Sequence, residues 1–142
     1  MKYYAVIDTN MLVSSLLTGR ADSPTVKVMK AISEGTLIPL YNEEILKEYD
    51  DVLHRKKFPF TEKRIRPVLN SIRAFGLRVN PSPTDEILPD MDDLVFYEVV
   101  MEKREDDAYL VTGNLRHFPP RNFIVTPAEM MALIDSAGES EP

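Results

Sequence analysis

Acidic side chains occur at three places in this sequence where they could act on a substrate together. They are Asp8, the glutamates Glu43, Glu44 and Glu48, and the aspartates Asp90, Asp92 and Asp93. Carboxylate oxygens are the ligands that hard divalent cations such as Mg²⁺ and Mn²⁺ prefer. Such a cation lowers the pKa of a bound water and offsets charge on a phosphoryl oxygen, while a carboxylate orients the water or accepts its proton. The chemistry indicated is hydrolysis of a phosphodiester.

Each acidic group also has an ordinary structural explanation. Asp8 could cap a helix that contains Met11, and a single helix glutamate is usually exposed to solvent. Acids at a helix start interact favourably with the helix dipole, but one acid meets that need. Two carboxylates 4 Å apart repel by about 1 kcal/mol in water and about 4 kcal/mol at an effective dielectric of 20. A bound cation would remove this repulsion, and the local pattern leaves both explanations open.

The amino-acid composition excludes several kinds of active site and metal site. The chain has 142 residues, of which 44% are hydrophobic, which is enough for one domain with a buried core. It contains no cysteine, which excludes disulfides, thiolate ligands and a cysteine nucleophile and suits a reducing compartment. The spacing of its two histidines, His54 and His117, does not suit a metal site. No signal segment or long apolar run is present, and we expect a cytoplasmic protein without a membrane span.

The elements that must position these acids alternate along the chain. Apolar runs predict strands at 3–7, 37–41, 77–79, 109–112 and 123–125. Helices are predicted after the caps Ser23, Asn42, Thr61 and Thr126 and from Asp92 or Asp93. Pro67 should kink its helix or delay its start. This alternation predicts an α/β fold, a three-layer sandwich with a central parallel sheet.

One domain is expected over residues 1–137, followed by a flexible polar tail over 138–142. In open parallel sheets, ligands bind at the carboxyl ends of the strands. Asp8 follows the first strand, and Thr112, Gly113 and Asn114 follow the fourth, so both places can meet the acidic helix start at one edge of the sheet.

Four segments of the chain resemble, in the same order, the motifs of the PIN-domain family. They are Val6–Ser14, Glu44–Leu53, Asp90–Asp93, and Tyr109–Asn114 with the following His117-Phe118-Pro119. The match covers nearly the whole chain, and the four motifs together are fairly specific. The likeness is greatest to the toxin components of bacterial and archaeal toxin–antitoxin pairs.

The resemblance implies a PIN-like fold and a metal-dependent endoribonuclease that uses Mg²⁺ or Mn²⁺. Its catalytic acids would be Asp8, Glu48 and Asp93, all three also metal ligands, with Asp90 as a supporting ligand. Glu48 matches better than Glu44, because the family's acid follows an Ile-Leu pair and precedes a Val-Leu ending. The implied partners are an RNA substrate and a cognate antitoxin protein, and dimers are common in the family.

Three polar residues complete the implied site. Asn10 and Thr112 match the polar residues that flank it, and Asn114 stands where many members have Asp. An amide keeps a carbonyl acceptor but removes one negative charge, so weaker metal binding is expected. Asn114 also leaves open a second function, a catalytically weak or inactive PIN-like module that binds RNA or protein.

The net charge of −6 averages two segments of opposite sign. Between Arg55 and Arg78 there are eight basic residues and one acid, and between Asp85 and Asp107 there are ten acids and two basic residues. The first segment could attract phosphates if it borders the acidic edge, although charge runs are usually solvated helix faces. The candidate RNA contacts are Arg55, Lys56, Lys57, Lys63 and Arg64. Phe58 could stack a base but would more often be part of a core.

A third function, phosphotransfer with Asp8 as the nucleophile, is disfavoured. The phosphatase type needs a second Asp two residues after the first, and position 10 is Asn. The G-x-x-x-x-G-K-[ST] loop of nucleotide-hydrolysing proteins is absent from the sequence.

Overall fold

A computed structural model describes residues 2–140 and contains one sheet of five parallel strands. The strands are β1 (Tyr3–Ile7), β2 (Leu37–Tyr41), β3 (Leu77–Arg78), β4 (Tyr109–Val111) and β5 (Ile124–Val125). Their order across the sheet is β3-β2-β1-β4-β5, which places β1 in the centre. The predicted α/β fold with a central parallel sheet is confirmed.

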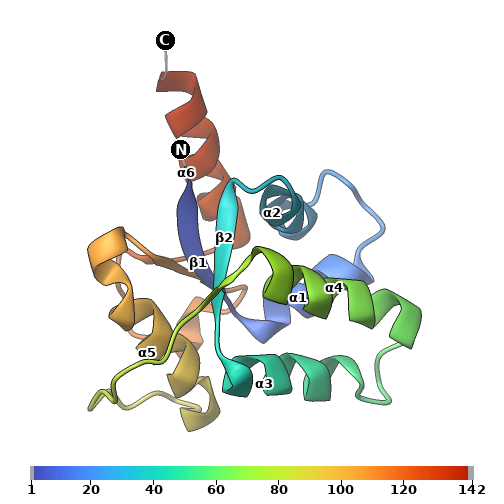
Figure 1. Cartoon of the computed structure of the whole chain (residues 1–142), viewed down its shortest axis with the longest axis horizontal. Helices are drawn as coiled ribbons and strands as arrows, with labels where there is room; N and C mark the ends of the chain where they lie inside the picture. Colours follow the sequence, from blue (N-terminus) through green and yellow to red (C-terminus); the bar gives the residue numbers. More distant parts are fainter. Residues whose placement is uncertain (1, 141–142) are drawn as a thin grey trace.

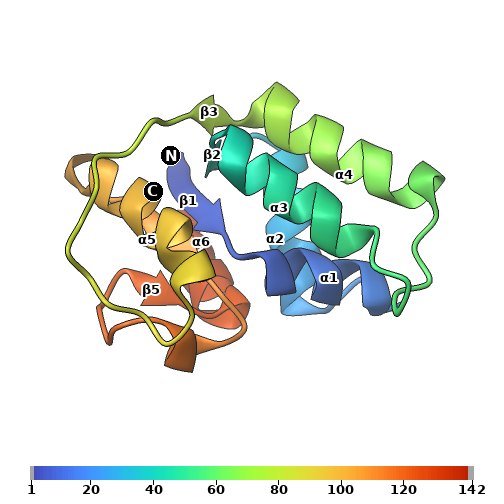
Figure 2. The same ribbon diagram turned by 90° about the horizontal axis from the view of Figure 1, so that it is seen from below.

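The helices form layers on both faces of this sheet. They are α1 (Thr9–Leu17), α2 (Pro24–Ser33), α3 (Glu43–Leu53), α4 (Glu62–Phe75), α5 (Leu94–Glu102) and α6 (Pro127–Ser140). The first four lie on one side of the sheet and α5 lies on the other (Figure 1). Seen from below, α3 and α4 run next to each other and α5 lies across β1 from them (Figure 2). α6 packs against α2.

Local hydrogen bonds explain where several helices begin. The Asn42 side chain accepts a hydrogen bond of 2.9 Å from the backbone N–H of Ile45, as its predicted role as a cap requires. Thr126 and Glu129 form the reciprocal capping box, with bonds of 3.0 and 3.1 Å between each side chain and the other residue's N–H. These starts follow from neighbouring residues alone, which is why the sequence predicts them.

Several predicted boundaries differ from the structure. The strands predicted at 77–79, 109–112 and 123–125 are each one residue shorter. α4 begins at Glu62 and contains Pro67, so the proline does not delay its start. Proline removes a single helical hydrogen bond, and the three buried side chains Ile65, Leu69 and Ile72 hold the helix against the core. α6 continues through Ser140, and residues 141 and 142 lie outside the described residues, so the flexible tail over 138–142 stays a prediction. Gly138 lowers helix propensity by about 1 kcal/mol without removing a hydrogen bond.

The core lies on both sides of β1, whose last three residues are fully buried. Tyr49 of α3 is buried beside Phe96 of α5, with ring centroids 6.2 Å apart. The Tyr49 hydroxyl donates a hydrogen bond to the carbonyl oxygen of Ile7. This bond joins α3 to the last residue of β1, directly before Asp8. None of the helices within residues 2–140 has the length and apolar character needed to cross a membrane.

Candidate active site

Asp8 is held at the carboxyl end of β1 by the neighbouring strand. Ile7 pairs with Val111, so the residues that follow β1 and β4 lie side by side. One carboxylate oxygen of Asp8 accepts a 2.7 Å hydrogen bond from the Thr112 hydroxyl, and the other accepts a 2.8 Å bond from the backbone N–H of Thr9. Asp8 therefore caps α1 and faces the sheet edge at once. Burial raises the pKa of Asp8, and the Thr112 hydrogen bond opposes that rise.

Glu48 reaches the same place from α3. The Thr9 hydroxyl donates a hydrogen bond to its carboxylate, which links the start of α1 to the middle of α3. Partial burial raises the pKa of Glu48, the Thr9 hydrogen bond lowers it, and the nearby charge of Asp8 raises it further. Thr9 therefore contacts both acids. Its backbone N–H donates to Asp8, and its hydroxyl donates to Glu48.

Asp93 is the most perturbed acid of the site. It ends the short 3₁₀ helix Met91–Asp93, directly before α5. Burial, with the charges of Asp8 and Asp90, raises its pKa to about 6. Its Oδ2 atom is buried and accepts no hydrogen bond from the described residues, although Nδ1 of His117 lies 3.3 Å away. A buried carboxylate oxygen in this state attracts a cation or a proton.

These side chains line one cleft of about 310 Å³. Its acidic wall consists of Asp8, Glu48, Asp90, Asp92 and Asp93. Arg55, Lys57 and Phe58, from the loop after α3, line the same cleft. The ring of Phe58 stacks on Phe60, with centroids 5.3 Å apart, and the Lys57 ammonium lies 5.1 Å from the Phe58 centroid. The cleft therefore combines a carboxylate cluster with a cationic and aromatic border.

The predicted site residues come together to different degrees. Asp8, Glu48, Asp90, Asp93 and Asn10 all line the cleft. Asn10 also accepts a 3.1 Å hydrogen bond from the N–H of Gly113, which fixes the loop after β4.

Thr112 and Asn114 support the cleft from beside it. Thr112 is fully buried and contacts Asp8 from the neighbouring strand. The side-chain nitrogen of Asn114 lies 2.9 Å from Nε2 of His117, and Asn114 is outside the residues that line the cleft.

The candidate RNA contacts divide into two groups. Arg55 and Lys57 line the cleft. Lys56 and Lys63 are exposed and do not line it. Arg64 donates a 2.7 Å hydrogen bond to the carbonyl oxygen of Leu16, which gives it a structural contact between α4 and α1.

Two residues of the site were not predicted. Thr9 orients Glu48, and His117 lines the cleft and contacts Asp93. The signal for His117 was its place in the segment His117-Phe118-Pro119, but spacing along the chain does not show that the 3₁₀ helix Leu115–His117 brings it to Asp93. The signal for Thr9 was only its position next to Asp8.

A divalent cation fits the donor chemistry of this cleft. The side chains that could hold it are carboxylates, as a hard cation requires, and Asp93 keeps a buried oxygen without a hydrogen bond. Within residues 2–140, however, the acids are not drawn together into a group of three that could hold an ion. The carboxylates of the cleft therefore suit a divalent cation by their charge and by their oxygen atoms. They lie farther apart than the ligands of a bound ion would.

The fold and the cleft define a class of protein, an α/β domain with acidic residues at the carboxyl edge of a parallel sheet. Residues 4–116 match the family model of the PIN domain, and the chain belongs to this family. PIN domains are generally nucleases and usually use divalent metal ions. The predicted family is thereby confirmed.

A solved structure shares this fold. The crystal structure of PAE2754 from Pyrobaculum aerophilum has a TM-score of 0.58 to this chain, at 13% sequence identity. The likeness covers 95% of this chain and 90% of that chain, and at this identity it concerns the fold. A search of curated proteins found no significant match.

Proposed function

We propose that this protein is an endoribonuclease that hydrolyses RNA phosphodiester bonds with Mg²⁺ or Mn²⁺. The observation that carries the proposal is the raised pKa of three acids, Asp8, Glu48 and Asp93, which come from separate elements and line one cleft. Such perturbed acids in a cleft are typical of functional sites. A structural role alone would not need three carboxylates with unfavourable burial.

The residues of the cleft have distinct roles in this proposal. Asp8, Glu48 and Asp93 would hold the cation, with Asp90 in support. When bound, the cation supplies a more acidic water and offsets charge on the phosphoryl group. Thr112 and Thr9 keep the first two acids in position through the hydrogen bonds described above.

The substrate would be held by the other border of the cleft. Arg55 and Lys57 would bind phosphates of the strand, and Phe58, which also lines the cleft, would contact a base. The presence of both charge signs in one cleft is consistent with a nucleic-acid substrate that meets a cation there.

The second candidate is a module that binds RNA or protein without cleaving RNA. Asn114, where many members have Asp, favours it, because the surroundings of the cleft carry one negative charge fewer to attract a cation. The contact of His117 with Asp93 favours it too, since the imidazole lies 3.3 Å from the carboxylate oxygen that a cation would need.

Cleavage of single-stranded RNA by the full chain distinguishes the two candidates. We expect degradation with Mg²⁺ or Mn²⁺, none with EDTA, and a loss of at least about 100-fold in Asp8→Asn and Glu48→Gln, the scale seen when one charge-stabilising group is removed. Asp135→Asn, which removes an exposed carboxylate of α6, is the matched control and should cleave like the wild type. RNA binding without cleavage under any metal would support the module.

We also propose that the protein is the toxin of a toxin–antitoxin pair, that it acts in the cytoplasm and that it forms a homodimer. Induced expression in a bacterial host should then arrest growth for the wild type but not for Asp8→Asn, and the product of an adjacent gene should restore growth. Growth without arrest would contradict the toxin role and leave the nuclease proposal standing. Light scattering of the purified chain tests the dimer.

A further inference from the structure

A second concave site lies next to the acidic cleft and has different chemistry. It has a volume of about 550 Å³ and is lined by Leu115, Arg116, Phe118, Pro119, Pro120, Arg121 and Ile124. The 3₁₀ helix Leu115–His117 connects the two sites. His117 lines the cleft, whereas its neighbours Arg116 and Phe118 line this pocket.

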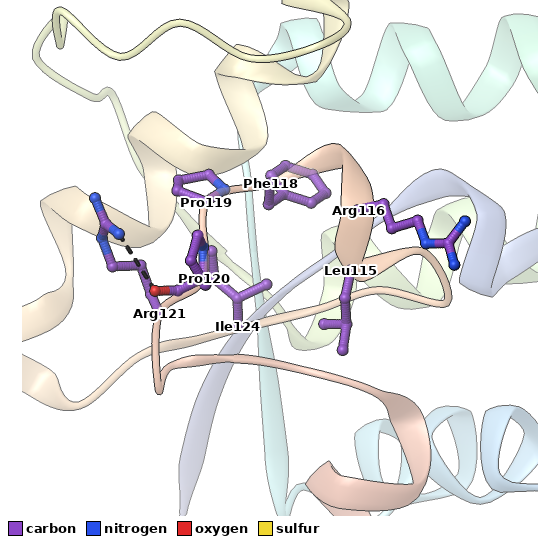
Figure 3. A pocket seen from close by; sticks show the side chains of 7 residues that line it. All are labelled: Leu115, Arg116, Phe118, Pro119, Pro120, Arg121 and Ile124. Atoms are coloured by element: carbon purple, nitrogen blue, oxygen red, sulfur yellow. Dashed lines mark hydrogen bonds between the residues drawn. The ribbon is translucent and has the colours of Figure 1, made fainter.

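The lining combines an apolar floor with two cations. Figure 3 shows the rings of Phe118 and Pro119 side by side, Pro120 and Ile124 in the middle, and the two arginines at opposite sides. None of the lining residues is acidic, although the whole chain carries a formal charge of −6. The pocket therefore attracts a ligand that is both anionic and apolar.

Both arginines have guanidinium groups available for such a ligand. Arg116 is exposed, and among the ion pairs of residues 2–137 none involves it. Arg121 lies 3.8 Å from the half-buried Glu86, a solvent-accessible contact that contributes little, and its guanidinium also donates a 3.2 Å hydrogen bond to the carbonyl oxygen of Pro120. Guanidinium groups of this kind bind phosphates with planar, paired hydrogen bonds.

We propose that this pocket binds the base of an RNA nucleotide next to the scissile phosphate, with Arg116 and Arg121 on the flanking phosphates. A nucleotide carries a flat apolar face and a negative charge, which are the two properties that the lining complements. The volume lies within the usual range of ligand pockets, about 300–1,000 Å³. This inference rests on the proposed function, because it places the pocket beside the site of cleavage.

A binding experiment tests the pocket without requiring cleavage. The full chain in EDTA is titrated with single-stranded RNA tetranucleotides while backbone amide shifts are recorded by NMR. We expect shifts of the amides of residues 115–118 and 121–124 with RNA, and with ribose 5-phosphate, which lacks a base, only smaller shifts next to Arg116 and Arg121. An acidic peptide that shifts the same residues while RNA does not would overturn the proposal and indicate a protein-docking surface.

A double variant of the pocket can be compared with a matched double variant elsewhere in the chain. Leu115→Ala with Arg116→Ala removes an exposed Leu-Arg pair from the pocket, and Leu77→Ala with Arg78→Ala removes an exposed Leu-Arg pair from β3. RNA affinity should fall by about 5- to 100-fold in the first double variant, the range expected for one stacked base, and stay unchanged in the second. Equal affinities of the two variants would contradict the proposal.

Cleavage kinetics then relate the pocket to the reaction. An abasic nucleotide is placed at each position around the cut site in turn. At one position it should lower kcat/KM of the wild type by about 5- to 100-fold and have less than about a twofold effect on the Leu115→Ala and Arg116→Ala double variant. If no RNA is cleaved but the amide shifts appear, the proposed nuclease function fails, and of the pocket assignment only the binding of an RNA base holds. If cleavage occurs with no position sensitive to the missing base, the pocket assignment fails alone.

Discussion

Replacing Asp93 by Asn should stabilise the folded protein while it removes RNA cleavage. Asp93 has a pKa of about 6 in place of its ordinary 3.8, because burial and the charges of Asp8 and Asp90 disfavour its ionised form. Between these two pH values the folded protein holds a proton on Asp93 that the unfolded chain has lost. The free energy of unfolding therefore falls as the pH rises from 3.8 through 6, and the full penalty is present above that range.

The size of the effect follows from the same interval. At 1.36 kcal/mol per pH unit, the raised pKa corresponds to about 3 kcal/mol at most. The Asp93 side chain is 14% exposed, and solvent screening reduces this to about 2 kcal/mol. For a domain of this length, 2 kcal/mol corresponds to a rise in Tm of about 4–8 °C.

Thermal and urea unfolding of the wild type and Asp93→Asn, from pH 4 to 8 in EDTA, measure this difference. The variant should be more stable at pH 8, and the two curves should converge towards pH 4, where Asp93 is protonated. Asp92→Asn is the matched control, because it removes one charge from the same cleft at an exposed position. The reasoning would be refuted if Asp93→Asn lost stability at pH 8, or if Asp92→Asn gained as much.

Three further results are expected. Adding 5 mM Mn²⁺ at pH 8 should raise the Tm of the wild type, because a ligand that binds only the folded state stabilises it. The Tm of Asp8→Asn should not rise. Equal shifts of the two Tm values would show that the ion binds elsewhere. Arg55→Ala with Lys57→Ala should reduce the slope of log affinity for single-stranded RNA against log salt by about 1.4, since each phosphate contact contributes about 0.7, and an unchanged slope would remove these residues from the interface. Tyr49→Phe should lower the free energy of unfolding by about 1–3 kcal/mol in urea, because it leaves the buried carbonyl oxygen of Ile7 without its donor; a neutral substitution would show that this bond contributes nothing.

Much of the fold could be predicted because its signals are local. The caps Asn42 and Thr126 depend on residues three positions away, and the apolar runs identify the strands. The order of the strands could not be predicted, since an apolar run shows that a segment is buried but not which segment pairs with it. The position of Pro67 inside α4 was also beyond local rules, because packing of the helix against the core outweighs the lost hydrogen bond.

The acids that line the cleft are among the residues predicted from the sequence. The contacts that hold these acids in place were not predicted. Asp8 and Asp93 stand at element ends, where a parallel sheet gathers polar residues at one edge. The bond from Thr9 to Glu48 depends on how α1 packs against α3, and the contact of His117 with Asp93 depends on a short 3₁₀ helix. Both are set by packing between distant segments, which leaves no spacing pattern in the sequence.

The hydroxyl bond from Thr112 to Asp8 has a consequence for the time at which the cleft forms. The two residues are 104 positions apart in the chain. At a synthesis rate of about 5–20 residues per second, Asp8 leaves the ribosome roughly 5–20 s before Thr112. During that interval β4 is absent, and although β2 can already pair with β1, Asp8 lacks the hydrogen bond from the Thr112 hydroxyl. A nascent chain that would cleave RNA is therefore without an assembled cleft until its synthesis is nearly finished, while it is still attached to a ribosome made largely of RNA.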